Sequence, residues 1–218
     1  MSNNVLVVLP HPDDESFGAS GTLAKLVQQG AQVTYACLTL GEMGRNMGIP
    51  PFASRITLPS VRKLELEESC RAIGIQDLRM LGFHDKTIEF EPHEVLDGTI
   101  ESLINELNPA LIITFYPGYS VHPDHDATGA AVIRTVQKLP EEQRPVVHCI
   151  AFAKNCEQHI GKADVVNDVT DFIEHKMSSI KAHRSQFQVA DLLGSKHPSP
   201  EEINKRFGNE AFWTYRFK

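Results

Sequence analysis

Two short segments of the chain carry the residue types that bind transition metals and move protons. The first is His11–Glu15, with the sequence HPDDE, and the second is His122–His125, with the sequence HPDH. A lone His or Asp in a loop is usually a surface or capping residue, and Asp13 or Asp14 could cap a following helix. Two such clusters in one chain are harder to explain in that way, and they favour a shared metal site.

His11, Asp14 and His125 together form the ligand set of a catalytic zinc site. Such sites usually take three protein ligands from His and Asp or Glu, and they keep one position open for water. A zinc ion in that place makes a nucleophilic water available near neutral pH and polarises a substrate carbonyl. The two segments therefore predict one zinc ion per chain, with metal-dependent hydrolysis as its chemistry.

The neighbouring residues Asp13, His122 and Asp124 are suited to moving protons at such a site. Asp13 adjoins a metal ligand and is predicted to act as general base for the attacking water. His122 is predicted to stabilise the tetrahedral oxyanion and then to protonate the leaving amine. Asp124 is predicted to hydrogen-bond His122 and to fix its tautomer. Amide hydrolysis needs this combination, because an amine is a poor leaving group unless it is protonated.

The four cysteines and the remaining histidines have no such neighbours. No C-x-x-C pair occurs, and a chain of this length folds without disulfides, so we predict free thiols in a reducing cytoplasm. We expect the remaining histidines to be structural; they are His84, His93, His148, His159, His175, His183 and His197.

Short apolar runs alternate with helical patterns along the chain and supply the elements that must position the site. Apolar runs predict strands at residues 5–9, 33–40, 78–81, 110–116 and 146–153. Helical spacing predicts helices at residues 18–29, 60–73, 92–107, 128–138 and 172–187. This alternation favours an α/β fold, with a mostly parallel sheet covered on both faces and a single domain over residues 1–218.

Both polar segments follow predicted strands, which end near Leu9 and Tyr116. In an open α/β sheet, ligands bind beyond the carboxyl ends of the strands, so we expect the two segments to meet at that edge. Residues 41–59 are rich in Gly, Pro, Met and Arg and show no clear period. A loop of this length inside a compact domain is usually functional or disordered.

Composition excludes several classes of function. The net charge of −7 disfavours a broad nucleic-acid interface, which needs clustered Lys and Arg. The longest apolar runs are too short to span a bilayer, and Met1–Asn4 lacks the basic stretch of a signal peptide. We therefore expect a cytoplasmic protein whose partner is a small molecule rather than nucleic acid or membrane. The sequence leaves open whether the chain forms a homo-oligomer.

The HPDDE and HPDH segments resemble the two signature motifs of the PIG-L/LmbE-like family of zinc N-deacetylases. Softer matches extend the resemblance over nearly the whole chain: Thr39–Glu42, the Arg-x-x-Glu formed by Arg62 and Glu65, and His183–Gln186. The resemblance implies a Rossmann-like three-layer fold and a zinc ion on the ligand set given above. It also implies Asp13 as base and His122 as acid or oxyanion partner.

Within that family, the chain is most similar to the deacetylases of bacillithiol biosynthesis. Gly41–Gly48, Phe115–Tyr119 and Phe212–Tyr215 carry this closer likeness. It implies that the N-acetyl group of N-acetylglucosaminyl malate is removed, giving glucosaminyl malate and acetate. Family members often have consecutive glycines after HPDDE, whereas here Ser20 precedes Gly21.

The substrate implied by this likeness carries two malate carboxylates, which Arg binds better than Lys. Arg45 and Arg62 are the predicted contacts for the anionic group or the sugar. The alternative for Arg62 is an ion pair with Glu65 or Glu68 on the same helix. Mycothiol-pathway relatives have a mobile Tyr at the position that Ser120 occupies here. Tyr119, one residue earlier, is therefore a third predicted substrate contact.

Other functions remain open from the residues alone. The substrate could be another N-acetylglucosamine derivative or a bacillithiol S-conjugate. Two His and one carboxylate also occur in non-haem iron oxygenases, although those sites usually lie in β-rich barrels. A metal-dependent phosphoesterase and a carbohydrate-binding protein that retains the metal are further alternatives. No G-x-S-x-G, P-loop or dinucleotide fingerprint occurs, which disfavours serine hydrolases and nucleotide-binding enzymes.

Overall fold

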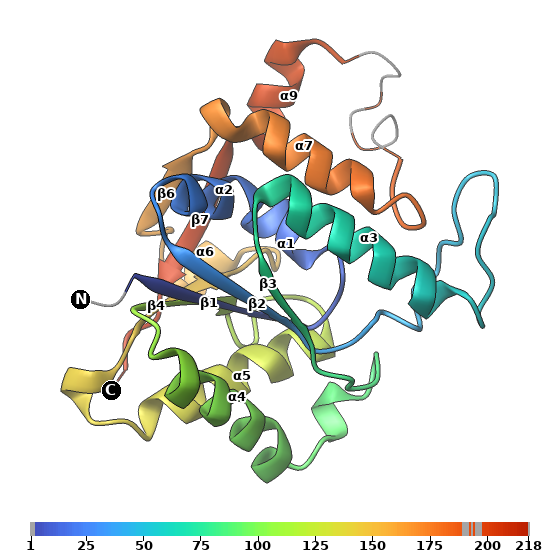
Figure 1. Ribbon diagram of the computed structural model, residues 1–218. Coiled ribbons are helices and arrows are strands. Elements are labelled where there is room, and N and C mark those ends of the chain that lie inside the picture. The colour runs from blue at the N-terminus through green and yellow to red at the C-terminus, as the bar shows by residue number, and fades with distance from the viewer. Residues whose placement is uncertain (1–2, 189–191, 193, 195–197, 218) are drawn as a thin grey trace.

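The centre of the computed structural model is a sheet with the strand order β3-β2-β1-β4-β5-β7-β6 (Figure 1). Its strands are β1 (Asn4–Leu9), β2 (Gln32–Cys37), β3 (Asp77–Met80), β4 (Leu111–Phe115), β5 (Val146–Ile150), β6 (Val165–Asp168) and β7 (Asn209–Thr214). Strands β1 to β5 pair in parallel, and β7 runs antiparallel to β5 and β6. The predicted α/β class and mostly parallel sheet are confirmed.

The structure describes residues 3–188, 192, 194 and 198–217. His197, which the sequence predicts to be structural, lies outside these residues, as do Met1 and Ser2 of the amino-terminal segment. Among the described residues, no helix is both long and apolar enough to cross a bilayer. All four cysteines are buried and free, as predicted.

Helices cover both faces of the sheet (Figure 1). They are α1 (Asp14–Gly18), α2 (Ser20–Gln28), α3 (Leu58–Ile73), α4 (His93–Leu107), α5 (Pro123–Gln137), α6 (Cys156–Ile160), α7 (Ile173–Ala182) and α9 (Pro200–Phe207), with short 3-10 turns η1 (Ile88–Phe90), η2 (Glu141–Gln143) and η3 (Thr170–Phe172). Alternate residues of β1 face opposite layers: Val5 and Val7 pack with α2 and α3, whereas Leu6 and Val8 pack with α4 and α5. This is the three-layer arrangement that the family resemblance implies.

Several element boundaries differ from the sequence-based prediction. The predicted helix over residues 18–29 corresponds to α2, and a short helix that was not predicted, α1, precedes it. Helix α5 begins five residues before the predicted start at Thr128, because Pro123 suits a first helical turn and His122 caps it. The predicted late helix ends at Ala182 instead of Phe187. Strands β6 and β7 carry no apolar run long enough to be predicted.

The order of the strands places both polar segments at one point. The chain leaves β1 towards β2 and β3, then returns through α4 to β4 on the other side of β1. The crevice outside the carboxyl ends of β1 and β4 is therefore the topological switch point, where open α/β sheets bind ligands. His11 follows β1, and His122 and His125 follow β4, so the predicted meeting of the two segments is confirmed.

Candidate metal centre

Three ligand atoms from His11, Asp14 and His125 converge at the switch point; we call these residues the metal cluster. His11 Nδ1 lies 3.1 Å from His125 Nε2 and 3.4 Å from an Asp14 carboxylate oxygen. The other Asp14 oxygen lies 3.2 Å from His125 Nε2. Around a tetrahedral zinc with bonds near 2.0 Å, neighbouring ligand atoms lie about 3.3 Å apart. The spacing and the donor set therefore fit zinc.

Hydrogen bonds on the far side of each imidazole fix which nitrogen faces the cluster. His11 Nε2 lies 3.1 Å from Asp124 Oδ2 and 3.2 Å from Asp85 Oδ1. A proton on Nε2 therefore has two carboxylate acceptors, which leaves the lone pair on Nδ1 for a metal. His125 Nδ1 lies 3.0 Å from the Ser120 carbonyl, which likewise leaves Nε2 free. Metal-binding histidines are commonly oriented by such partners.

Two other groupings contain possible ligand atoms within 4.8 Å of one another, and each includes His11. One joins His11 to Asp85 and Asp124, which are the acceptors of its Nε2 proton. The other joins it to His122 and His125, but His122 Nδ1 already accepts the Asp124 N–H. The grouping with Asp14 fits best, because it leaves these hydrogen bonds intact. The imidazoles of His125 and His11 outweigh the effect of burial and hold the pKa of Asp14 below its usual range.

Asp13 lies at the wall of the same crevice in an unusual backbone conformation. Its φ of 114° is in the left-handed region, and its side chain does not cap α1. Two contacts hold it there: its N–H donates to the Glu15 carboxylate at 3.0 Å, and Arg62 donates to its Oδ2 at 2.7 Å. Burial raises the pKa of Asp13 to about 6, against the opposing effect of the Arg62 guanidinium. Such a carboxylate is well matched to taking a proton near neutral pH.

His122 stands on the other side of the metal cluster. Its ring meets the His11 ring edge-on at 4.8 Å and lies 5.1 Å from the His125 ring. Because Nδ1 accepts the backbone N–H of Asp124, a neutral His122 carries its proton on Nε2. Burial lowers the pKa of His122, and the imidazoles of His11 and His125 lower it further. The residue is thus a neutral hydrogen-bond donor.

The predicted hydrogen bond from the Asp124 carboxylate to His122 is not formed. That carboxylate accepts the backbone N–H groups of Lys86 and Ile88 at 2.6 and 3.2 Å and faces His11 Nε2 instead. The physical reason is the start of α5: the backbone N–H of Asp124 points at His122, while its side chain turns into the fold. Asp124 therefore orients His11 rather than His122.

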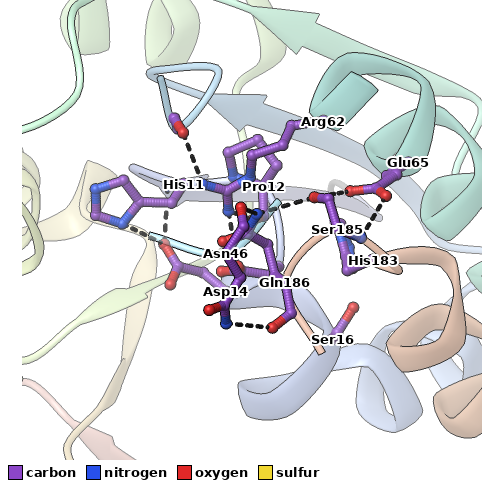
Figure 2. A network of polar contacts seen from close by, with 12 residues as sticks. His11, Pro12, Asp14, Ser16, Asn46, Arg62, Glu65, His183, Ser185 and Gln186 are labelled. Carbon is purple, nitrogen blue, oxygen red and sulfur yellow. Dashed lines mark hydrogen bonds and ion pairs between the residues drawn. The ribbon is translucent and has the colours of Figure 1, made fainter. Parts of the chain in front are cut away.

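Arg62, a predicted substrate contact, lines the cavity around the metal cluster, but its guanidinium is engaged by the protein. Its guanidinium is buried and donates to the carbonyls of Gly41 and Pro12 as well as to Asp13 (Figure 2). The alternative ion pair within α3 is also not formed, because Glu65 accepts the N–H and hydroxyl of Ser185 instead. Arg62 thus positions Asp13. Gly41 allows this close approach, since a Cβ there would lie 1.9 Å from the guanidinium.

Tyr119, the third predicted substrate contact, lies outside the cavity around the metal cluster. Its ring packs between Tyr116 and His159, with centroids 5.6 and 6.1 Å away. The structure therefore does not bring Tyr119 to the position expected of a substrate contact.

Around the metal cluster lies a cavity of about 330 Å³, which we call the metal pocket. Its rim includes the predicted contact Arg45 together with Lys86, which the sequence analysis missed. Both side chains are exposed, and neither has a carboxylate partner among the described residues. Lys86 follows β3 with no neighbouring motif; only its left-handed φ of 66° is unusual, and the sequence does not reveal it.

A second cluster lies behind the HPDDE segment, formed by Glu15, Ser16, Ser69, Ser179 and His183; we call it the glutamate cluster. Glu15 Oε1 accepts from His183, Ser69 and Ser16 at 2.7, 2.6 and 3.0 Å. Burial raises the pKa of Glu15, but the His183 imidazole and these donors hold it below its usual range. Nδ1 of His183 has no partner among the described residues. His183 is thus buried and structural, as the sequence predicts.

Comparison with known proteins gives a consistent result. Residues 6–136 match the model of the PIG-L family, which is described as GlcNAc-PI de-N-acetylase. The chain is 50% identical over 222 residues to a Bacillus cereus protein named "Probable N-acetyl-alpha-D-glucosaminyl L-malate deacetylase 2", and all of both chains is covered. A Bacillus subtilis protein of the same name is 48% identical over 219 residues, covering 100% of this chain and 99% of that protein.

A solved structure supports the same relationship. The N,N'-diacetylchitobiose deacetylase from Pyrococcus horikoshii, complexed with an inhibitor, superposes with a TM-score of 0.75 at 28% sequence identity. The superposition covers 98% of this chain and 84% of that protein. The similarity therefore includes the strands and helices that form the crevice.

Proposed function

The chain belongs to the PIG-L family, and from that premise we propose that it deacetylates N-acetylglucosaminyl L-malate, a step of bacillithiol biosynthesis, with a bound zinc ion. As a member of this family it is a deacetylase, a hydrolase of N-acetyl amide bonds. The observation that carries the proposal is the metal cluster, in which the two imidazole nitrogens lie 3.1 Å apart and each lies 3.2 to 3.4 Å from an Asp14 carboxylate oxygen, beside Asp13 and His122.

When bound by His11, Asp14 and His125, zinc would supply a polarised substrate carbonyl and an acidified water. Asp13 takes the proton of the attacking water, while Arg62 and the Glu15 carboxylate hold it in place. The raised pKa of Asp13 makes its carboxylate a stronger base than an exposed aspartate.

His122 acts on the opposite side of the amide. Its Nε2–H donates a hydrogen bond to the oxyanion as the carbonyl carbon becomes tetrahedral. The proton that Asp13 took from the water then passes, directly or through His122, to the nitrogen as the C–N bond breaks, so that an amine rather than an amide anion leaves. The products are acetate and the free amino sugar. The water supplies the new oxygen of acetate and the hydrogen that the amine nitrogen gains.

Arg45 and Lys86 are the groups that we assign to the malate carboxylates. Both cations lie on the rim of the metal pocket and have no carboxylate partner among the described residues. In contrast, Arg62 is buried, and both terminal nitrogens of its guanidinium already donate to Asp13, Pro12 or Gly41. An anionic aglycone at the rim would therefore meet two free positive charges.

The test is an amine-release assay on N-acetylglucosaminyl malate, free N-acetylglucosamine and N-acetylated bacillithiol S-conjugates, with metal analysis of the same sample. We expect the malate glycoside to give the highest kcat/KM, with zinc bound to the protein. Faster turnover of an S-conjugate would move the assignment to that substrate. Turnover that requires iron and oxygen would refute zinc-dependent hydrolysis.

Single substitutions of the two rim cations separate the aglycone contact from catalysis. Replacing Arg45 or Lys86 by Ala should raise KM for the malate glycoside by about tenfold, the value of one charge-assisted hydrogen bond. KM for free N-acetylglucosamine should change much less. Lys63→Ala is the matched control, because Lys63 is an exposed cation of α3 that does not line the metal pocket. Equal effects on both substrates would refute the assignment.

A further inference from the structure

A second cavity, of about 550 Å³, adjoins the metal pocket and has a different character. Asp13 and Asp14 line both cavities, so the two meet at the base and at a metal ligand. Beyond these carboxylates the second cavity is walled mainly by Phe17, Phe115, Ile150, Phe152, Phe187 and Ala211. One side of the reaction centre is therefore polar and cationic, and the other is apolar.

The aromatic wall is in direct contact with the metal cluster. The Phe115 ring stacks on the His125 imidazole, with centroids 4.0 Å apart and an interplanar angle of 10°. Phe152 meets His125 at 5.8 Å and Phe115 at 5.9 Å. Phe17 and Phe187 form an edge-on pair at 4.8 Å. The apolar surface therefore begins at a metal ligand and leads away from it.

The polar groups on the far wall are not available to a ligand. Glu210 accepts the backbone N–H groups of Gly21 and Thr22 at 2.9 and 2.7 Å. Its remaining capacity is taken by the buried ammonium of Lys176, 2.5 Å away. Asn209 is the other polar residue there, and it is neutral. No unpaired charge among the described lining residues, other than the shared aspartates, could recognise an anion or a sugar hydroxyl.

We propose that this cavity is an acyl subsite, and that the chain hydrolyses N-butanoyl and N-hexanoyl amino sugars as well as N-acetyl ones. The inference rests on the proposed function, because it concerns the acyl side of the same scissile amide. With the sugar and its anionic group in the metal pocket, the acyl group points across Asp13 and Asp14 into the apolar side. An acetyl methyl is about the size of one water, roughly 30 Å³, and leaves most of this cavity unfilled.

The reaction is the same for each acyl length. Water adds to the carbonyl carbon, the new C–O bond replaces the C–N bond, and a fatty acid and a free amine leave. Only the length of the alkyl chain differs, so no additional reactant is needed. Burying each further methylene in an apolar site favours binding by up to about fourfold. Longer acyl groups should therefore lower KM.

The test compares N-acetyl-, N-butanoyl- and N-hexanoylglucosaminyl malate with the zinc-loaded enzyme. We expect kcat/KM for the hexanoyl substrate to be at least about one tenth of that for the acetyl substrate, because methylene discrimination in an open apolar site is weak. If the acetyl substrate is hydrolysed and the hexanoyl value falls below that limit, the acyl subsite is refuted. If the acetyl substrate itself is inert, the proposed function fails instead.

Filling the apolar cavity with a larger side chain should make the enzyme select against long acyl groups. Ala211 lines it and is exposed, so Ala211→Leu projects a larger side chain into the space without filling a closed core. The hexanoyl-to-acetyl ratio of kcat/KM should fall by about tenfold or more. Ala151→Leu, on the same wall, is a second variant in case the first folds poorly. Val146→Leu is the control, because exposed Val146 lies at the end of β5 opposite to Ile150 and does not line the cavity. An equal fall in the hexanoyl-to-acetyl ratio for this control would refute the subsite.

Product inhibition gives a readout that does not depend on turnover of a new substrate. Hexanoate should inhibit deacetylation of the acetyl substrate more strongly than butanoate, and butanoate more strongly than acetate, by about fourfold per buried methylene at most. Ala211→Leu should abolish this order. Equal inhibition by the three acids would contradict an apolar subsite beside the reaction centre.

Discussion

The metal cluster and the glutamate cluster both combine a carboxylate with imidazole and both include residues of His11–Glu15, yet their hydrogen-bond donors differ. In the metal cluster, the protons of both imidazoles are directed outwards, to Asp124 and to the Ser120 carbonyl. Acceptor atoms therefore face one another across 3.1 to 3.4 Å. In the glutamate cluster, Oε1 and Oε2 of Glu15 both receive donors from the protein.

This difference shows how one short segment can provide both a ligand site and a structural anchor. Buried acceptors without donors are costly unless a cation lies between them. Buried acceptors with matched donors hold the surrounding elements together, and the partners of Glu15 come from α1, α3 and the turn after α7. The metal cluster should thus govern metal content and activity, whereas the glutamate cluster should govern stability.

The largest expected effect is that of Asp14→Ala. Because two neutral imidazoles alone do not make a catalytic zinc site, zinc should be lost and kcat/KM should fall by more than about a thousandfold. The melting temperature in excess chelator should fall only slightly, because without metal the change removes one hydrogen bond, from the His11 backbone N–H to Asp14 Oδ2. Glu94→Ala, at an exposed carboxylate of α4, is the control. If Asp14→Ala still binds one zinc ion per chain, Asp14 does not belong to the metal cluster.

Asp13→Asn should separate proton transfer from metal binding. Asn keeps the size of the side chain and an oxygen for Arg62, but it cannot accept a proton from water. We expect kcat to fall by about 10² to 10⁴-fold, the usual contribution of a general base. Zinc content, measured on the same preparation, should equal that of the wild type. Loss of zinc in parallel with activity would assign Asp13 to the metal cluster.

Glu15→Gln should act on the other cluster. Removing one partner of a buried ion pair usually destabilises a protein by about 3–5 kcal/mol, so the unfolding transition should move to lower temperature. The shift should be the same with zinc and with chelator, and zinc content of the folded variant should be unchanged. Glu94→Gln is the matched exposed control. A normal melting temperature with reduced zinc would contradict the division between the clusters.

Asp124→Asn should give the smallest effect, because Asp124 touches a ligand rather than the metal. Weakening the acceptor of the His11 Nε2 proton should lower zinc affinity by about 10 to 100-fold. Competition with a chromophoric chelator measures this directly. Unchanged affinity would show that Asp85 alone orients His11, whereas complete loss would place Asp124 among the ligands.

The sequence was sufficient to predict that His11, Asp14 and His125 meet, and at which edge of the sheet. Strand-like runs end just before each polar segment, and parallel strands bring such segments to one edge, so local pattern and topology agree. The same reasoning failed for Arg62, since an Arg followed by Glu three residues later looks like an exposed helix pair. In the fold this Arg is buried against Asp13, a contact across 49 residues that no periodicity reveals.

Other parts of the site depend wholly on long-range packing. Asp85 is an isolated acid after β3, and only the folded sheet carries it to within 3.2 Å of His11 Nε2. Glu15 belongs to the recognisable segment, but its partner His183 is 168 residues away. Strand β6 is a four-residue strand at the sheet edge, and β7, between β5 and β6, mixes exposed polar with buried apolar residues. Such features follow from the packed structure rather than from local pattern.

The carboxylate of Glu210 has a consequence for the order in which the site is completed during synthesis. The three residues of the metal cluster lie within residues 11–125 and leave the ribosome well before Glu210. The N–H groups of Gly21 and Thr22, at the start of the helix behind the HPDDE segment, gain their acceptor only when β7 has emerged. A nascent chain therefore carries the whole metal cluster long before helix α2 has its acceptor, and a strand almost 190 residues later secures the helix behind the HPDDE segment.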